Sequence, residues 1–353
     1  MFTVPDSVTP PWPTALGGRI ERLTVASDLL RGNPLGDPHE RPLWVYLPPG
    51  YADERRRFPS AYLLHGYGGS VVSWGDRPSY GRTVLELIDA AITAGQIPQA
   101  IVVCVDGWTR YGGSQWIDSP GTGAYHSYLC EEIVGYVDAR YRTRPGREHR
   151  VVAGKSSGGF GALVAAMRRP DLFGGCASHA GDAFYEVVYQ PHLRDVVRGL
   201  RPWDGDVMAW WRDFQARCPD VRPADRMLEY VLGVSACFSP GSDGAPVLPM
   251  DPVTGEMRPG PWQQWLDWDP VRMIPGHARQ LRSLRAVWLD AGSEDDFFLD
   301  LGVAALRRAM DGIGMPDGAV CSGIVAGADH DSIGRRQVDS LGWMLHRLGA
   351  EDG

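Results

Sequence analysis

The sequence predicts an α/β fold in which a mostly parallel central sheet is flanked by helices. Three observations carry this prediction. Short apolar runs rich in Val, Ala and Leu alternate with segments of helical periodicity, most of the later runs are continuously apolar as buried parallel strands are, and the chain opens with a hairpin pattern. The chain has 353 residues, of which 44% are hydrophobic, so it can bury a large core.

The strands and helices are expected in the following order along the chain. The first two strands, Arg19–Ser27 and Leu43–Leu47, form an antiparallel hairpin with its turn around Leu35–Arg41. The later strands are expected at Ala61–Leu64, Ile101–Val105, Arg150–Ala153, Cys176–Ser178, Ala286–Leu289 and Ala319–Val325. The helices are expected at Thr83–Ala94, Ser127–Arg140, Gly159–Arg168, Leu299–Ile313 and Ile333–Leu348.

Residues 182–270 interrupt this alternation. They hold six of the thirteen tryptophans and a stretch rich in Gly and Pro, Ser239–Pro261. Because the strand pattern resumes after them, residues 1–353 are expected to form one domain into which 182–270 is inserted. Loops at the carboxyl ends of parallel strands surround the active sites of such sheets. We therefore expect a Trp-rich cap over the site, and substrate contact by at least one of its tryptophans is a hypothesis.

The strongest motif surrounds Ser156. Residues 151–163 read Val-Val-Ala-Gly-Lys-Ser-Ser-Gly-Gly-Phe-Gly-Ala-Leu, which places Gly-x-Ser-x-Gly between a short apolar strand and the start of a helix. This pattern is typical of a nucleophile elbow, because glycines two residues before and after the serine allow a sharp turn that exposes its hydroxyl. The sequence therefore predicts Ser156 as a nucleophile.

The same residues could be mistaken for a phosphate-binding loop. Such a loop ends in Gly-Lys-Ser, but it requires a glycine where this chain has His149. No Gly-x-Gly-x-x-Gly follows a strand either, and the six cysteines include no Cys-x-x-Cys pair. We therefore expect neither a nucleotide or other organic cofactor nor a metal.

A serine nucleophile needs a base and a carboxylate that orients the base, expected in the chain order Ser, acid, His. His330 lies between the last predicted strand and the last predicted helix, where the loop of the base is expected. The acid is expected after the strand Ala286–Leu289, and Asp295 is favoured there over Asp296. Four other histidines fit the position of the base less well: His179, His192, His277 and His346.

The reaction of an ester also requires backbone N–H groups that bind the developing oxyanion. One is expected from Ser157, which follows the nucleophile, and the other from the glycine-rich loop after the third strand. In that loop, which reads His65-Gly-Tyr-Gly-Gly, we assign the second donor to the amide of Tyr67. His65 is expected to order the turn rather than to transfer protons.

Several segments together resemble one family of α/β hydrolases. They are Trp44–Tyr51, Tyr62–Gly69 with Trp74, Trp116–Ser119, Gly154–Leu163, Gly292–Asp295 and His330. In this order they are similar to the esterase family that includes esterase D (S-formylglutathione hydrolase), enterochelin esterases, feruloyl esterases and the antigen 85 mycolyltransferases. The resemblance implies an α/β-hydrolase fold, with Ser156 as nucleophile, Asp295 as acid, His330 as base, and Tyr67 and Ser157 at the oxyanion hole.

Five residues near these motifs are candidate substrate contacts: His65, Trp74, Trp116, Lys155 and His179. Lys155 is the sole lysine of the chain and adjoins the predicted nucleophile. It either contacts a substrate carboxylate or supports the elbow, and the alternative is a solvated or salt-bridged neighbour of the motif.

Composition and charge restrict the partners that can be expected. A net charge of −8 disfavours nucleic acid and anionic membranes as partners, because proteins bind both through clustered Lys and Arg residues. No run is long and apolar enough to span a bilayer, and the first residues lack the features of a secretory signal, so a cytoplasmic location is expected. The sequence leaves open whether the protein forms a homo-oligomer.

The expected function is that of a serine carboxylic-ester hydrolase, which forms an acyl-enzyme with a small-molecule ester, one with an aromatic or sugar moiety being compatible with the tryptophans. Alternatives that use the same residues are an acyltransferase with another acceptor than water and an amidase or peptidase. A catalytically inactive binding protein on the same fold is a further alternative.

Overall fold

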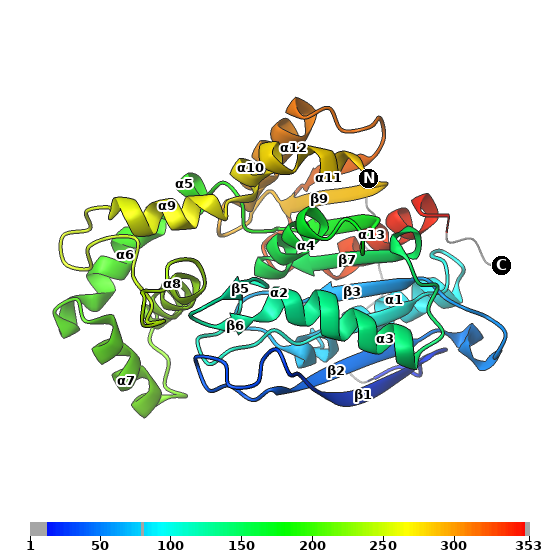
Figure 1. The fold of residues 1–353 in the computed structure, drawn as a ribbon, viewed down its shortest axis with the longest axis horizontal. Helices are drawn as coiled ribbons and strands as arrows, with labels where there is room; N and C mark the ends of the chain where they lie inside the picture. The colour runs from blue at the N-terminus through cyan, green and yellow to red at the C-terminus, as the bar shows by residue number, and fades with distance from the viewer. Residues whose placement is uncertain (1–12, 79–80, 350–353) are drawn as a thin grey trace.

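The fold is built around one eight-stranded sheet with strand order β1-β2-β4-β3-β7-β8-β9-β10 (Figure 1). The computed structural model describes residues 13–78 and 81–349. The expectation about a secretory signal concerns the first residues of the chain, most of which lie outside the described residues. The strands are β1 (Arg19–Ala26), β2 (Glu40–Leu47), β3 (Ser60–Leu64), β4 (Ile101–Val105), β7 (Arg150–Lys155), β8 (Gly175–His179), β9 (Ala286–Gly292) and β10 (Val320–Val325).

Strand directions confirm the predicted sheet. β1 pairs antiparallel with β2, and β2 pairs antiparallel with β4. All pairs from β4 through β3, β7, β8 and β9 to β10 are parallel. The carboxyl ends of these six strands therefore lie at one edge of the sheet, where the loops that follow them can meet. A separate two-stranded ribbon joins β5 (Asp118–Ser119) and β6 (Gly123–Ala124).

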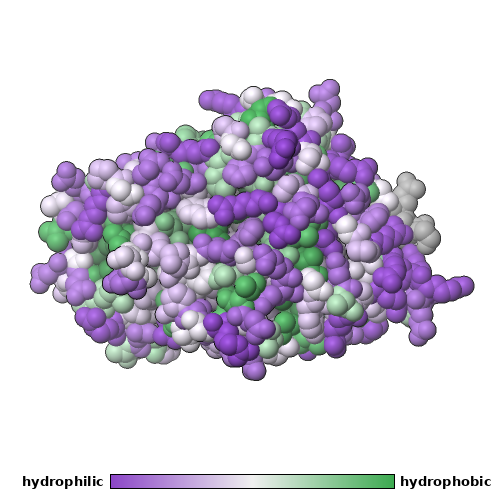
Figure 2. All heavy atoms as spheres, in the orientation of Figure 1, coloured by the Kyte–Doolittle hydropathy of each residue, from purple (hydrophilic) through white to green (hydrophobic). Residues whose placement is uncertain are grey.

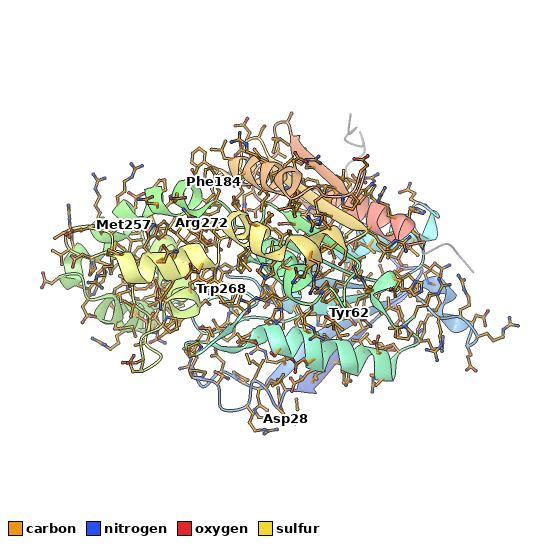
Figure 3. The ribbon with its side chains drawn as sticks, turned by 45° about the horizontal axis from the view of Figure 1, so that its top comes forward. Asp28, Tyr62, Phe184, Met257, Trp268 and Arg272 are labelled. Atoms are coloured by element: carbon orange, nitrogen blue, oxygen red, sulfur yellow. The ribbon has the colours of Figure 1, made fainter. Side chains whose placement is uncertain are left out.

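Helices cover both faces of the sheet, because the apolar side chains of each strand alternate between two cores. Tyr62 and Leu64 of β3 belong to the larger core, whereas Ala61 and Leu63 belong to the smaller one. The smaller core also contains apolar residues of α1 (Val84–Thr93) and α13 (Gly334–Arg347). On the other face lie α3 (Val134–Arg140), α4 (Ser157–Arg168) and α12 (Leu299–Gly312). Tyr62 is labelled close to α3 in Figure 3.

The predicted helices are all present, with small differences at their ends. The expected helix Ser127–Arg140 is composite: it consists of α2 (Tyr125–Ser127), a π-helical segment (Tyr128–Ile133) and α3. The helix α1 begins with a capping box, in which Thr83 accepts the amide of Glu86 and Glu86 accepts the amide of Thr83. Paired hydrogen bonds therefore fix the start of this helix.

The chain between β8 and β9 forms a series of helices, most of which stand beside the sheet in Figure 1, whereas the last two before β9 lie against the sheet near α12. The helices are α5 (Tyr185–Val188), α6 (Gln190–Leu200), α7 (Val207–Arg217), α8 (Asp225–Phe238), α9 (Pro259–Asp267), α10 (Pro270–Met273) and α11 (Ala278–Arg282). The Asp269 carboxylate accepts the amides of Phe184, Tyr185 and Val271, so one side chain joins the beginning of this segment to its end. Phe184, Trp268 and Arg272 are labelled at this junction in Figure 3.

The outer surface is mostly polar. In the face shown in Figure 2, hydrophilic residues dominate and hydrophobic ones form small separate groups. Across residues 13–78 and 81–349, no helix is both long enough and apolar enough to cross a membrane.

Candidate active site

Ser156 occupies a strained turn between β7 and α4. Its backbone φ is 55° and ψ is −125°, a conformation that non-glycine residues rarely adopt. The turn is fixed by a 2.9 Å hydrogen bond from the Ser156 amide to the carbonyl of His179 on the neighbouring strand. A methyl group on Gly158 would lie 2.1 Å from the Leu64 carbonyl oxygen, so only glycine fits there. The local geometry is that of a nucleophile elbow.

His330 and Asp295 are paired beside this turn. Asp295 lies in the loop after β9 and His330 in the loop after β10, and His330 Nδ1 is 2.9 Å from Asp295 Oδ2. The other carboxylate oxygen accepts the amide of Phe297 at 2.9 Å and that of Leu299 at 3.5 Å. Burial raises the pKa of Asp295, but the hydrogen bond and charge of His330 and these amides outweigh it, so the pKa lies below its ordinary value.

The neighbouring acidic residues lie elsewhere. Asp296 and Glu294 are exposed, whereas Asp290 is buried and contacts His179 and Arg336. Of the two aspartates that the sequence left open, Asp295 is thus the one in contact with His330.

Ser156 and His330 line one pocket of about 590 Å³. Its walls come from the loop after β3, from the elbow, from α8, and from the loops after β8, β9 and β10. The described residues hold no hydrogen bond between the Ser156 hydroxyl and His330, a contact that often tightens only in a substrate complex. Two of the three residues predicted as a triad therefore line one cavity, and the third, Asp295, contacts the His330 ring.

The loop after β3, which contains Tyr67, passes beside Ser156. A methyl group on Gly66 would lie 3.2 Å from Ser156 Cβ, so the backbone of this loop passes directly beside Ser156. Neither the Tyr67 amide nor the Ser157 amide donates a hydrogen bond to another described group. Both N–H groups therefore have no described acceptor, and their role as oxyanion donors stays a prediction.

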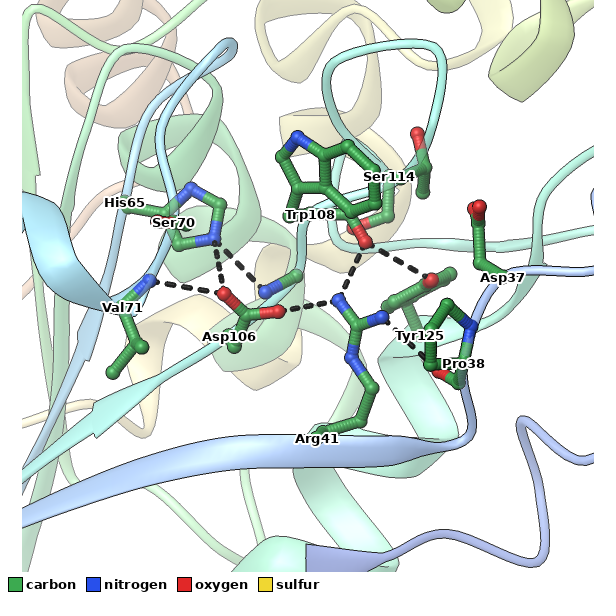
Figure 4. A network of polar contacts seen from close by, with 12 residues as sticks. Asp37, Pro38, Arg41, His65, Ser70, Val71, Asp106, Trp108, Ser114 and Tyr125 are labelled. Atoms are coloured by element: carbon green, nitrogen blue, oxygen red, sulfur yellow. Dashed lines mark hydrogen bonds and ion pairs between the residues drawn. The ribbon is translucent and has the colours of Figure 1, made fainter. Parts of the chain in front are cut away.

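A buried polar network holds this loop (Figure 4). His65 Nδ1 donates to the Gly66 carbonyl at 2.9 Å, and His65 Nε2 accepts the Gly107 amide at 2.9 Å. Burial lowers the pKa of His65, which favours the neutral ring that these two bonds require. The neighbouring Asp106 accepts the amide of Val71 and forms a buried ion pair with Arg41. His65 thus orders the turn.

The side chain of Tyr67 joins the same loop to α8. Its hydroxyl donates to the carbonyl of Tyr111 or to that of Glu229, which is 2.7 Å away. Methyl groups on Gly112 or Gly233 would collide with this side chain, so both glycines make room for it. The amide of Tyr67 and the helix α8 are therefore positioned by a single residue.

The other candidate substrate contacts have different surroundings. Trp74 is buried and, with His65, lines an adjoining pocket of about 490 Å³. Lys155 lines both pockets and pairs with Asp331, which is largely exposed. Trp116 is buried against the elbow helix and donates from Nε1 to the His65 carbonyl.

His179 lies outside both pockets. It is fully buried between Asp290, 2.9 Å from its Nδ1, and Ser340 of α13, 2.9 Å from its Nε2. The structure thus does not bring His179 to the substrate pocket.

The insertion contributes to the pocket through residues that the sequence did not single out. All six of its tryptophans fall within the described residues, and none of them lines the pocket at Ser156. Asp182 and Tyr230 of the insertion do line it, as does Phe297 of the loop after β9. Of these, only Asp182 carries a sequence signal, a carboxylate shortly after the carboxyl end of a core strand. In the part of the chain that the structure describes, no group of three His, Cys, Asp or Glu side chains could hold a metal ion.

The sheet, the elbow and the loops around it define an α/β hydrolase, and comparison with solved structures agrees with this fold. A ferulic acid esterase superposes with a TM-score of 0.61 at 17% identity, covering 95% of this chain and 100% of that one. An S-formylglutathione hydrolase from Agrobacterium tumefaciens superposes with a TM-score of 0.56 at 18% identity, covering 96% and 98% of the two chains.

The chain belongs to the protein family described as "Putative esterase", which it matches over residues 38–311. A segment of 134 residues is 32% identical to an endo-1,4-beta-xylanase/feruloyl esterase from Xylanibacter ruminicola and covers 37% of this chain and 18% of that protein. Another of 196 residues is 30% identical to esterase Rv1288 from Mycobacterium tuberculosis and covers 53% of this chain and 40% of that protein. The matches thus span less than half the length of these curated relatives.

Proposed function

We propose that the protein is a serine carboxylic-ester hydrolase that works through an acyl-enzyme. One observation carries the proposal: Ser156 stands in a strained elbow and shares a pocket with His330, and Asp295 is hydrogen-bonded to the Nδ1 atom of His330. Membership of an esterase family supports the hydrolysis of esters.

The first half of the reaction forms the acyl-enzyme. The Ser156 hydroxyl oxygen attacks the ester carbonyl carbon while its proton passes to His330 Nε2. Asp295 keeps the proton on Nδ1, so that Nε2 is free to act as the base, and stabilises the imidazolium that forms. The amides of Tyr67 and Ser157 bind the oxyanion, and His330 then donates its proton to the leaving alkoxide as the C–O bond breaks.

The second half returns the enzyme to its starting state. His330 takes a proton from water, whose oxygen attacks the acyl carbon. The same two amides bind the second oxyanion, and the bond to Ser156 breaks as its oxygen regains the proton. The products are a carboxylic acid and an alcohol.

The proposed substrate is a small-molecule ester. A pocket of about 590 Å³ accommodates a small organic molecule. An aromatic acyl or alcohol group is compatible with the rings of Tyr230 and Phe297 in its wall.

Hydrolysis of a chain-length series of p-nitrophenyl esters tests the proposal. We expect turnover in the wild type, none in Ser156→Ala, and an acyl adduct on the intact wild-type protein by mass spectrometry. Equal turnover by the two proteins would refute the role of Ser156. Addition of an alcohol that lowers acid release without lowering p-nitrophenol release would identify an acyltransferase instead.

A further inference from the structure

The pocket contains a carboxylate that the proposed mechanism does not use, that of Asp182. Asp182 follows β8 by three residues, is 2% exposed and lines the pocket together with Ser156 and His330. The preceding Gly181 packs against the first turn of α4, since a methyl group on it would lie 3.0 Å from the Gly159 carbonyl carbon. Asp182 is therefore fixed next to the elbow.

Two tyrosines hold one oxygen of this carboxylate. The Tyr189 hydroxyl donates to Asp182 Oδ2 at 2.8 Å, and the Tyr230 hydroxyl lies 2.8 Å from that of Tyr189. The Tyr230 hydroxyl is also 3.4 Å from Asp182 Oδ2, and the Gln115 side-chain amide donates to the same oxygen at 3.5 Å. Burial raises the pKa of Asp182 to about 6, against the opposing effect of the Tyr189 hydrogen bond, so the group is largely ionised at pH 7.

No arginine or lysine of the described residues pairs with this carboxylate, and among the cationic groups only the charge of a protonated His330 lowers its pKa. Asp182 forms no ion pair with any described residue, whereas three other buried aspartates, Asp106, Asp225 and Asp290, each pair with an arginine. Asp182 Oδ1 accepts no hydrogen bond from the described residues, and this atom remains accessible to solvent. A buried carboxylate without a cation is costly, and in a pocket it indicates a functional site.

The walls near Asp182 are aromatic. Tyr230 and Phe297 both line the pocket, with ring centroids 6.3 Å apart and planes inclined at 45°. Phe297 in turn meets the ring of His330 edge to face, with centroids 4.9 Å apart. A carboxylate beside aromatic rings suits a cation, which gains both the charge attraction and the interaction with the ring faces.

We propose that Asp182, with Tyr230 and Phe297, binds a positively charged amino or quaternary ammonium group of the substrate. This inference rests on the proposed ester hydrolysis and assigns it a substrate class, esters that carry a cation. A neutral hydroxyl would fill the free acceptor but leave the charge uncompensated. A protonated amine would do both, and a quaternary ammonium group would compensate the charge without donating a hydrogen bond.

Matched esters test this proposal. We would compare the p-nitrophenyl ester of trimethylammonio-butyrate with the ester in which a tert-butyl group replaces trimethylammonio, and acetylcholine with its tert-butyl isostere. The two pairs place the cation in the acyl part and in the alcohol part. The variants are Asp182→Asn and, as a control with the same charge change at an exposed position outside the pocket, Asp296→Asn.

In at least one pair, the wild type is expected to prefer the cationic ester by about tenfold or more in kcat/KM. Asp182→Asn should bring this ratio close to one while it retains turnover of the neutral ester, and Asp296→Asn should keep the wild-type ratio. A wild type that prefers the neutral ester in both pairs would overturn the proposal. So would an Asp182→Asn variant that loses both esters by the same factor, because Asp182 would then act on His330.

Binding separates this inference from the proposed function. If no ester is hydrolysed, the proposed function fails, and calorimetry with phenyltrimethylammonium still tests the cation site in Ser156→Ala. Binding that is lost when Asp182→Asn is added supports the site. Equal binding by the two variants, or no binding by either, refutes it.

Discussion

The substitution Asp295→Asn tests the geometry of the site most directly. Asp295 Oδ2 faces His330 Nδ1, and its other oxygen accepts the amides of Phe297 and Leu299. An asparagine amide oxygen would be held by those two backbone donors, which turns the NH₂ group toward His330. His330 would then carry its proton on Nε2, where it cannot accept the proton of Ser156.

The expected effect is a fall in kcat of about 10⁴-fold, which corresponds to about 5 kcal/mol of transition-state stabilisation. KM for a p-nitrophenyl ester and the thermal midpoint should change little, because neither the pocket nor the backbone donors are lost. Asp296→Asn serves as the matched control and should stay within about threefold of the wild type, since Asp296 is exposed. A fall of less than about tenfold in Asp295→Asn, or a larger fall in Asp296→Asn, would refute this assignment of the acid.

Three further predictions concern stability, measured by denaturant unfolding. Gly158→Ala should lower the free energy of unfolding by about 2 to 4 kcal/mol, because the added methyl group lies 2.1 Å from a carbonyl oxygen of β3. Gly135→Ala, in α3 with nothing within 4 Å, should instead be neutral or raise it by up to about 1 kcal/mol, and equal effects would contradict the packing argument. Burial raises the folded-state pKa of Asp182 from 3.8 to about 6, so wild-type stability should fall as pH rises between these values. Asp182→Asn should therefore be more stable than the wild type by about 3 kcal/mol at pH 8, with no difference near pH 3. A difference in stability that did not depend on pH would show that titration of this carboxylate is not its cause. Lys155→Met should change stability by less than about 1 kcal/mol, because the partner Asp331 has an 86% exposed side chain, and a loss above about 2 kcal/mol would indicate a structural role for the ion pair.

The sheet and the elbow could be predicted because their signals are local. β4 has the predicted bounds, Ile101–Val105, since five consecutive apolar residues are buried on both faces of the sheet. The turn at Ser156 follows from glycines within two residues of it. Asp295 and His330 could be selected because the order of strands fixes which loops meet at the carboxyl edge.

The remainder of the site depends on contacts between distant residues. Tyr230 meets Asp182 across 48 positions of the chain, and α8 has no motif that points to the pocket. His179 ends its strand at the same edge as Ser156, but side chains alternate between the two faces of a sheet, and its own reaches Ser340 on α13. Which face a terminal strand residue takes is decided by strand register, which the sequence pattern of a fully buried strand does not reveal.

The hydrogen bonds of Tyr67 limit how the protein can be engineered by exchanging segments with relatives. Its hydroxyl contacts a carbonyl of α8 within the insertion, and its own amide is a proposed oxyanion donor. A chimera that exchanged residues 182–270 for the insertion of a relative would therefore alter the catalytic loop as well as the pocket. New substrate ranges are more accessible through single changes on the pocket side of α8, with Gly233 kept as the space for the tyrosine ring.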